Sequence, residues 1–62
     1  MTRIWMSNRM FVHVYSSVEG VMCRLKHSKP GEFLSFASVN DDGDGTHEVW
    51  INVGSITMVE EV

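Results

Sequence analysis

The sequence contains only one cysteine, Cys23, among its 62 residues. An internal disulfide is therefore impossible, and the usual covalent support of very small domains is excluded. A domain of this length buries only about 60% of the surface that its unfolded chain exposes, so its stability margin is thin. We therefore expect the single domain spanning residues 1–62 to associate with other chains, most simply as a homo-oligomer.

The sequence also has no apolar run long enough for a membrane span, and its opening segment, MTRIWMSNRM, has none long enough for a signal peptide, so we expect neither. We expect no contact with membranes and a cytoplasmic location. Low-complexity tracts and repeats are absent, and 44% of the residues are hydrophobic, which is too many for a disordered chain.

Motifs of common enzyme chemistry are missing as well. No serine lies in a nucleophile elbow, and no glycine-rich phosphate loop follows a strand and opens a helix. A domain of this size has little interior in which to shelter a reaction from water. We therefore predict that the protein is not an enzyme and needs no cofactor.

Charge is small overall, at −3, but it is divided along the chain. All five basic residues lie before residue 30, and seven of the eight acidic residues lie after it. Such a division can direct contacts between copies or with an acidic partner. The alternative is that folding simply mixes both signs over the surface.

The sequence does contain a repeated alternation of apolar and polar residues, which is typical of β-strands. It recurs in MFVHVY (10–15), VMCRLKH (21–27), FLSFASV (33–39), HEVWINV (47–53) and SITMVEEV (55–62). We therefore predict an all-β fold, a five-stranded antiparallel meander that closes into a small SH3-like or OB-like barrel. The segment TRIWM (2–6) would add a sixth strand at an edge.

Turn residues separate these segments. SSVEG (16–20) is interpreted as the turn from the first strand to the second, and NDDGDG (40–45) as the loop of a hairpin. Pro30 and Gly31 suit the two central positions of a type II turn, because proline fixes φ and glycine accepts a positive φ.

The loop at 40–45 also resembles part of a calcium-binding loop. Counted from Asn40, it offers oxygen ligands at the first, third and fifth positions and glycine at the sixth. The twelfth position, Ile51, cannot coordinate calcium, and both flanks alternate as strands, so a plain hairpin loop is the main interpretation. A weak, hydrated calcium site is the alternative, with the candidate ligands Asp42, Asp44 and Glu48. The histidines and Cys23 show no paired spacing, so no other metal site is predicted.

Outward-facing aromatic and basic residues are the candidate binding residues. If Val12 and Val14 face the core, their neighbours on the first strand face outward, beside basic residues of the segment 21–27. The partner-binding candidates are Phe11, His13, Tyr15, Arg24, Lys26 and Trp50. Exposed aromatics on a sheet bind proteins or stack on nucleic-acid bases, but a small barrel can also bury both faces of its strands in part.

Two resemblances extend this interpretation. The strand, Asn/Asp/Gly turn and VWINVGSITMVEE segment within residues 33–61 resemble the hairpin and tail of FlbD-like small bacterial proteins and related phage proteins, which implies a β-hairpin here. FVHVYS (11–16) and GEFLSF (31–36) are similar to strands of cold-shock domains, which implies that Phe11 and His13 stack on bases. The glycine- and aromatic-rich first motif of cold-shock domains is absent.

The leading hypothesis is a non-enzymatic interaction protein that works by protein contact, as an accessory or inhibitor protein of a bacterium or phage. The alternative is a single-stranded nucleic-acid-binding module of the OB or cold-shock kind. The net charge of −3 weighs against the alternative, because neutralisation of phosphates supplies most nonspecific affinity.

Overall fold

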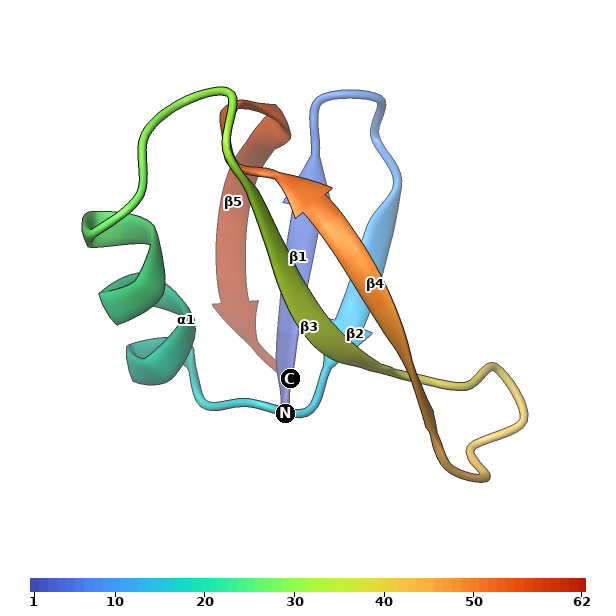
Figure 1. The fold of residues 1–62 in the computed structure, drawn as a ribbon. Coiled ribbons are helices and arrows are strands. Elements are labelled where there is room, and N and C mark those ends of the chain that lie inside the picture. The colour runs from blue at the N-terminus through green and yellow to red at the C-terminus, as the bar shows by residue number, and fades with distance from the viewer.

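A computed structural model describes residues 1–62 as one five-stranded antiparallel sheet with a single α-helix (Figure 1). The strands are β1 (Thr2–Met6), β2 (Phe11–Val14), β3 (Phe33–Val39), β4 (Thr46–Asn52) and β5 (Ile56–Glu61). The helix α1 (Val18–Lys26) connects β2 to β3, and a short 3₁₀ helix, η1 (Val53–Ser55), precedes β5. No helix is long and apolar enough to cross a membrane.

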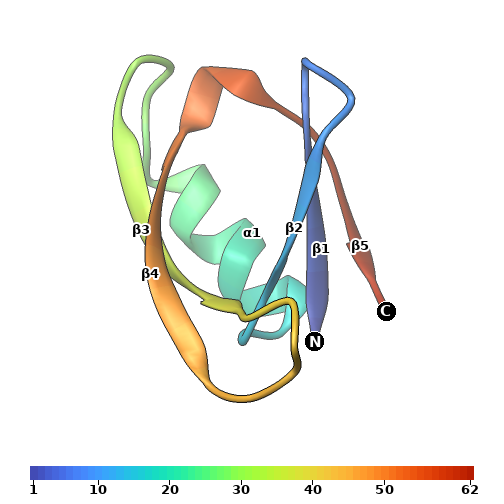
Figure 2. The ribbon, with the colours of Figure 1, turned by 90° about the vertical axis from the view of Figure 1, so that its right-hand side faces the viewer.

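The strand order across the sheet is β4-β3-β2-β1-β5. The mostly β character, with five antiparallel strands, is thus confirmed. Hydrogen bonds do not join β4 to β5, so the sheet curves without closing into a hydrogen-bonded barrel. Figure 2 shows the hairpin of β3 and β4 curving away from the other three strands.

The prediction that residues 2–6 form an additional strand at an edge is wrong in its placement. β1 lies inside the sheet, paired with β2 from Thr2 to Trp5 and with β5 from Thr2 to Met6. The full burial of Thr2 and Ile4 suits a strand with neighbours on both sides, and Arg3 and Trp5 alternate with them toward the outward face.

The predicted strand at 21–27 is also wrong, since this segment belongs to α1. The helix begins after Ser17, whose Oγ accepts a hydrogen bond from the Gly20 N–H at 3.0 Å, as an N-cap residue does. SSVEG is therefore a helix start, not a hairpin turn. Glu19 lies in the first turn, and the basic residues Arg24 and Lys26 lie in the last, which suits the helix dipole.

The apolar residues at 18–25 are compatible with both the two-residue period of a strand and the 3.6-residue period of a helix. Val21, Cys23 and Leu25 alternate as in a strand, whereas Val18, Val21 and Leu25 lie on one face of a helix. The structure realises the second pattern, because Val21 is fully buried and Cys23 is exposed.

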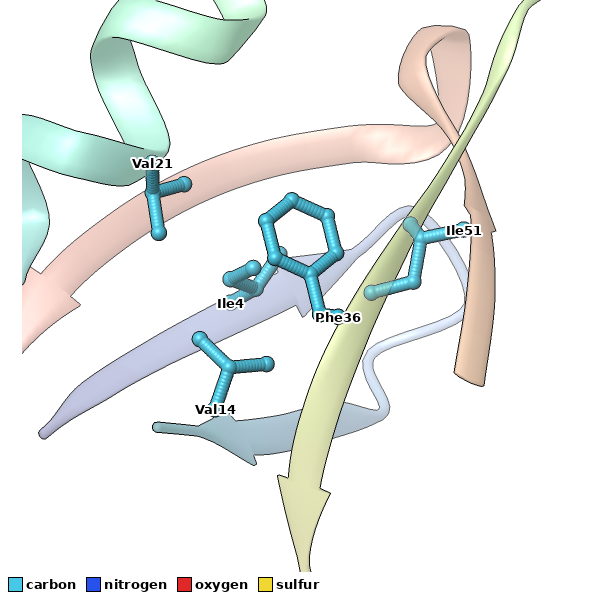
Figure 3. Close-up of a cluster of buried hydrophobic side chains, with 5 residues drawn as sticks. All are labelled: Ile4, Val14, Val21, Phe36 and Ile51. Atoms are coloured by element: carbon cyan, nitrogen blue, oxygen red, sulfur yellow. The ribbon is translucent and has the colours of Figure 1, made fainter. Parts of the chain in front are cut away.

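The core consists of five buried hydrophobic side chains, each from a different element (Figure 3). They are Ile4 of β1, Val14 of β2, Val21 of α1, Phe36 of β3 and Ile51 of β4. α1 contacts β5 and lies between β3 and β5 in the view of Figure 2. Val21 points from the helix toward the other buried side chains (Figure 3). The helix thus covers the core where strand pairing does not.

The weakest junction of the sheet lies between β2 and β3, whose only paired residues are Val14 and Ser38. Beyond that pair, the carbonyl group of Ser35 has no strand partner and accepts a hydrogen bond from Arg24 Nη1 at 2.7 Å. The same guanidinium lies 4.5 Å from the centroid of the Phe36 ring. Arg24 therefore satisfies a polar group that the sheet leaves unpaired.

Two local predictions are confirmed. Glu32 N–H donates to the Lys29 carbonyl at 3.1 Å and Gly31 has φ of 96°, as a type II turn through Pro30 and Gly31 requires. Residues 40–45 form the loop of the β3–β4 hairpin, which the Asn40 N–H closes by donating to the Gly45 carbonyl at 3.1 Å.

The helical placement of residues 21–27 is testable with two substitutions. Val21→Ala should lower the free energy of unfolding by about 2 kcal/mol, because it removes buried methyl groups. Cys23→Ser should change it by less than about 0.5 kcal/mol, because the thiol is exposed. Urea titration followed by circular dichroism measures both, and equal destabilisation by the two substitutions would support a strand instead.

Candidate functional site

Six side chains of three neighbouring strands form a surface that we call the Trp5 face. Its members are Arg3 and Trp5 of β1, Phe11 and His13 of β2, and Met58 and Glu60 of β5. In the strand register, Arg3 lies between His13 and Glu60, and Trp5 lies between Phe11 and Met58. Side chains directly opposite one another share a face of the sheet, and Ile4 occupies the other, buried face.

Aromatic rings occupy the middle of the Trp5 face. The Trp5 and Phe11 ring centroids are 4.7 Å apart, and the Phe11 and His13 centroids are 5.2 Å apart, both pairs tilted by 50°. The Arg3 guanidinium carbon lies 4.9 Å from the Phe11 centroid and 5.9 Å from that of Trp5. These distances lie within the ranges for contact between aromatic rings and for cation–π attraction.

The apolar part of this face remains open to solvent. Phe11 is 43% exposed, and Met58, on the opposite side of Trp5, is 47% exposed. A shallow depression of ≈ 420 Å³ adjoins them, lined by Trp5, Met6, Ser7, Arg9, Thr57 and Met58. A depression this open suits a side chain of a protein partner better than an enclosed small molecule.

The polar groups of the Trp5 face bond to one another. Arg3 Nη1 donates to Glu60 Oε1 at 3.2 Å, and Arg3 Nε donates to His13 Nε2 at 3.0 Å. The Trp5 indole N–H donates to the same Glu60 oxygen at 2.8 Å. These bonds hold the side chains of Arg3 and Trp5 in place before any partner binds.

The Trp5 indole N–H is the main cause of a lowered pKa at Glu60. Partial desolvation acts in the opposite direction, and the positive charge and hydrogen bond of Arg3 lower the pKa further. Glu60 is therefore ionised at neutral pH, and the Trp5 face contains both a cation and an anion.

The six predicted partner-binding residues do not form one surface. Phe11 and His13 belong to the Trp5 face, whereas Arg24 and Lys26 lie on α1. Tyr15 is exposed beyond the end of β2, where it lines a separate depression with Met1 and Thr2. Trp50 is exposed on β4, and its indole N–H donates to Glu48 Oε1 at 3.1 Å.

Sequence reasoning did not include Arg3 and Trp5 among the candidates, although TRIWM carries the signal. Its alternation separates Thr2 and Ile4 from Arg3 and Trp5, which puts the last two on the outward face of any strand formed there. Glu60 joins the Trp5 face only because β1 pairs with β5, and no local sequence pattern predicts that pairing.

The calcium candidates are not brought together. Asp42 Oδ1 accepts from the Asp44 N–H at 2.9 Å, as in a turn, while the Glu48 carboxylate bonds to Trp50. No group of three or more His, Cys, Asp or Glu side chains is positioned to hold a metal ion. The loop therefore has the geometry of a hairpin loop, which is the main prediction from its sequence.

The histidine rings bond to groups that are not nucleophiles. His13 bonds to Arg3, His27 Nδ1 lies 2.9 Å from the Cys23 backbone carbonyl, and His47 Nδ1 lies 2.6 Å from Asn40 Oδ1. No serine hydroxyl or cysteine thiol is hydrogen-bonded to a histidine. The absence of enzymatic activity stays a prediction.

No family model, curated protein or solved structure matches the chain. The resemblances to FlbD-like proteins and to cold-shock domains therefore stay hypotheses, and the functional argument depends on the geometry of the Trp5 face.

The pKa of Glu60 tests that geometry. In an NMR pH titration, the Glu60 carboxyl should titrate below its usual pKa, and Trp5→Phe should raise this pKa by removing the indole N–H. Because the folded pKa lies below the unfolded one, Glu60 stabilises the fold above the unfolded pKa. That contribution is lost as the pH falls through the folded pKa.

The matched control for this titration is Trp50→Phe, which removes the other indole N–H, bonded to Glu48, and should leave Glu60 unchanged. An ordinary Glu60 pKa in the unsubstituted protein, or one that Trp5→Phe leaves in place, would contradict the arrangement.

Proposed function

We propose that this protein binds another protein through the Trp5 face and performs no catalysis. The observation that supports this most strongly is the Trp5–Phe11 ring pair, packed at 4.7 Å on the outward side of the sheet with Phe11 still 43% exposed. Tryptophan and arginine are the residues that most often dominate binding energy at protein interfaces. A Trp and an Arg that are already held in place lose little side-chain entropy on binding.

The charges of this face also favour a protein partner. Arg3 is paired with Glu60, so the face presents a mixed polar rim around an apolar centre, as protein interfaces do. The further proposals are cytoplasmic location, self-association, an SH3-like arrangement of the strands, and a role as an accessory or inhibitor protein of a bacterium or phage.

Binding of single-stranded nucleic acid is the second candidate. It is supported by the adjacent rings of Phe11 and His13, whose centroids are 5.2 Å apart and whose strand position suits stacking with bases. Two observations rank it lower. The Glu60 carboxylate lies within the same face, where it repels phosphate, and the proposed cations Arg24 and Lys26 lie on α1 instead.

Affinity capture from the cytosol of the source cells, read by mass spectrometry, tests the first proposal. Phe11→Ala should weaken capture of the partner about tenfold or more, since a central aromatic contributes about 1 to 3 kcal/mol. Phe33→Ala is the matched control, because Phe33 is also an exposed aromatic, but it lies on β3 outside the Trp5 face. Equal capture by the unsubstituted protein and Phe11→Ala would contradict the proposal.

A titration with a fluorescent single-stranded oligonucleotide distinguishes the second candidate. Protein contact alone predicts no saturable binding at low salt. Nucleic-acid binding predicts saturation that salt weakens and that Phe11→Ala reduces by about 1 to 3 kcal/mol.

A further inference from the structure

β4 presents an open strand edge. It is the outermost strand of the sheet, with seven residues paired continuously to β3 and no bulge. Natural proteins protect such edges with proline, lysine, bulges or short strands, and THEVWIN contains neither proline nor lysine. A hollow of ≈ 230 Å³ separates its Trp50–Asn52 end from the β1–β2 turn. No other strand of the chain pairs with this edge.

The hydrogen bonds of β3 show which backbone groups of β4 point toward the open edge. The Ser35 and Ala37 carbonyls point away from β4, since they accept from Arg24 at 2.7 Å and from the Tyr15 N–H at 2.8 Å. Backbone polar groups alternate in direction along a strand, so residues 34, 36 and 38 bond to residues 51, 49 and 47. Those facing outward on β4 belong to Thr46, Glu48, Trp50 and Asn52.

We propose that this edge pairs with β4 of a second copy of the chain. The two strands run antiparallel about a twofold axis at Val49, which joins the two sheets into one. Glu48 then lies opposite Trp50 of the second copy, and Thr46 lies opposite Asn52. The outward-facing backbone groups of both strands meet as hydrogen-bonded pairs in this register, and each copy contributes the same surface.

Charge disfavours one competing register and the parallel orientation. A shift of two residues in one direction puts Glu48 opposite Glu48, and like charges directly opposite are destabilising, whereas a shift in the other direction loses the Trp50–Glu48 pairs. In the proposed register, the Trp50 indole, which already bonds to Glu48 in its own chain, faces a second Glu48 carboxylate. Antiparallel pairing also places the two acidic loops, residues 40–45, at opposite ends of the interface.

The other sheet edge does not offer an equivalent partner. α1 lies beside β5, which also carries Glu60 and Glu61 and would bring these acids toward Glu48. The β4 edge therefore forms a closed pair rather than an open chain of copies. The Trp5 face lies on β1, β2 and β5, so dimerisation through β4 leaves it free. This inference specifies the surface for the self-association proposed above, and it does not depend on the binding role of the Trp5 face.

Sedimentation equilibrium over micromolar to millimolar concentrations tests the pairing. The unsubstituted protein should form dimers. Trp50→Glu should raise the dimer dissociation constant at least about tenfold, because it places a second carboxylate opposite Glu48. Trp50→Lys loses the same ring but places a cation there, and should weaken the dimer less. Tyr15→Glu, an equivalent change at a 69% exposed aromatic beyond the end of β2, two strands away from the open edge, should leave the constant unchanged.

Amide hydrogen exchange of the unsubstituted protein gives a second readout. The N–H groups of Glu48 and Trp50 should become protected as the protein concentration rises, because they enter the new strand pair. A monomer at all concentrations would overturn the proposal. So would a dimer in which these two amides stay unprotected, or equal dissociation constants for Trp50→Glu and Trp50→Lys.

Discussion

The double pairing of β1 is the constraint on which the rest of the structure depends. Residues Thr2 to Trp5 pair with β2 on one side, and Thr2 to Met6 pair with β5 on the other, so β1 joins the first strands to the last. Its inward residues, Thr2 and Ile4, are fully buried, while Arg3 and Trp5 organise the outward face. Because side chains alternate along a strand, one segment supplies both the centre of the core and the centre of the candidate site.

The small core explains why the helix is needed. The sheet buries only four large apolar side chains by itself, and β2 and β3 are joined through one residue pair. α1 adds Val21 to that core, and Arg24 bonds to the Ser35 carbonyl that no strand reaches. α1 thus supplies both an apolar side chain for the core and a hydrogen-bond donor for an unpaired carbonyl. In a closed barrel, neighbouring strands would supply both.

Local signals predicted the local structure. The β3–β4 hairpin, the Pro30–Gly31 turn and the last strand follow from alternation and turn residues within a few positions of one another. The helix was missed because Val21 and Leu25 satisfy both periods, and the Ser17 N-cap was interpreted as a turn residue. Phe11 and His13 were placed outward correctly, but their contacts with Arg3 and Trp5 were missed. The Trp5–Glu60 bond joins residues 55 apart in sequence, beyond the reach of any periodicity.

Nuclear Overhauser contacts of the Trp5 side chain test the central claim most directly. β1 paired on both sides predicts contacts from the Trp5 indole protons to the Phe11 ring and also to the Met58 side chain, on opposite flanks. Contacts to Phe11 alone would put β1 at the edge of the sheet, and absence of both would remove the Trp5 face. Either result would contradict this account of the fold and of its binding surface.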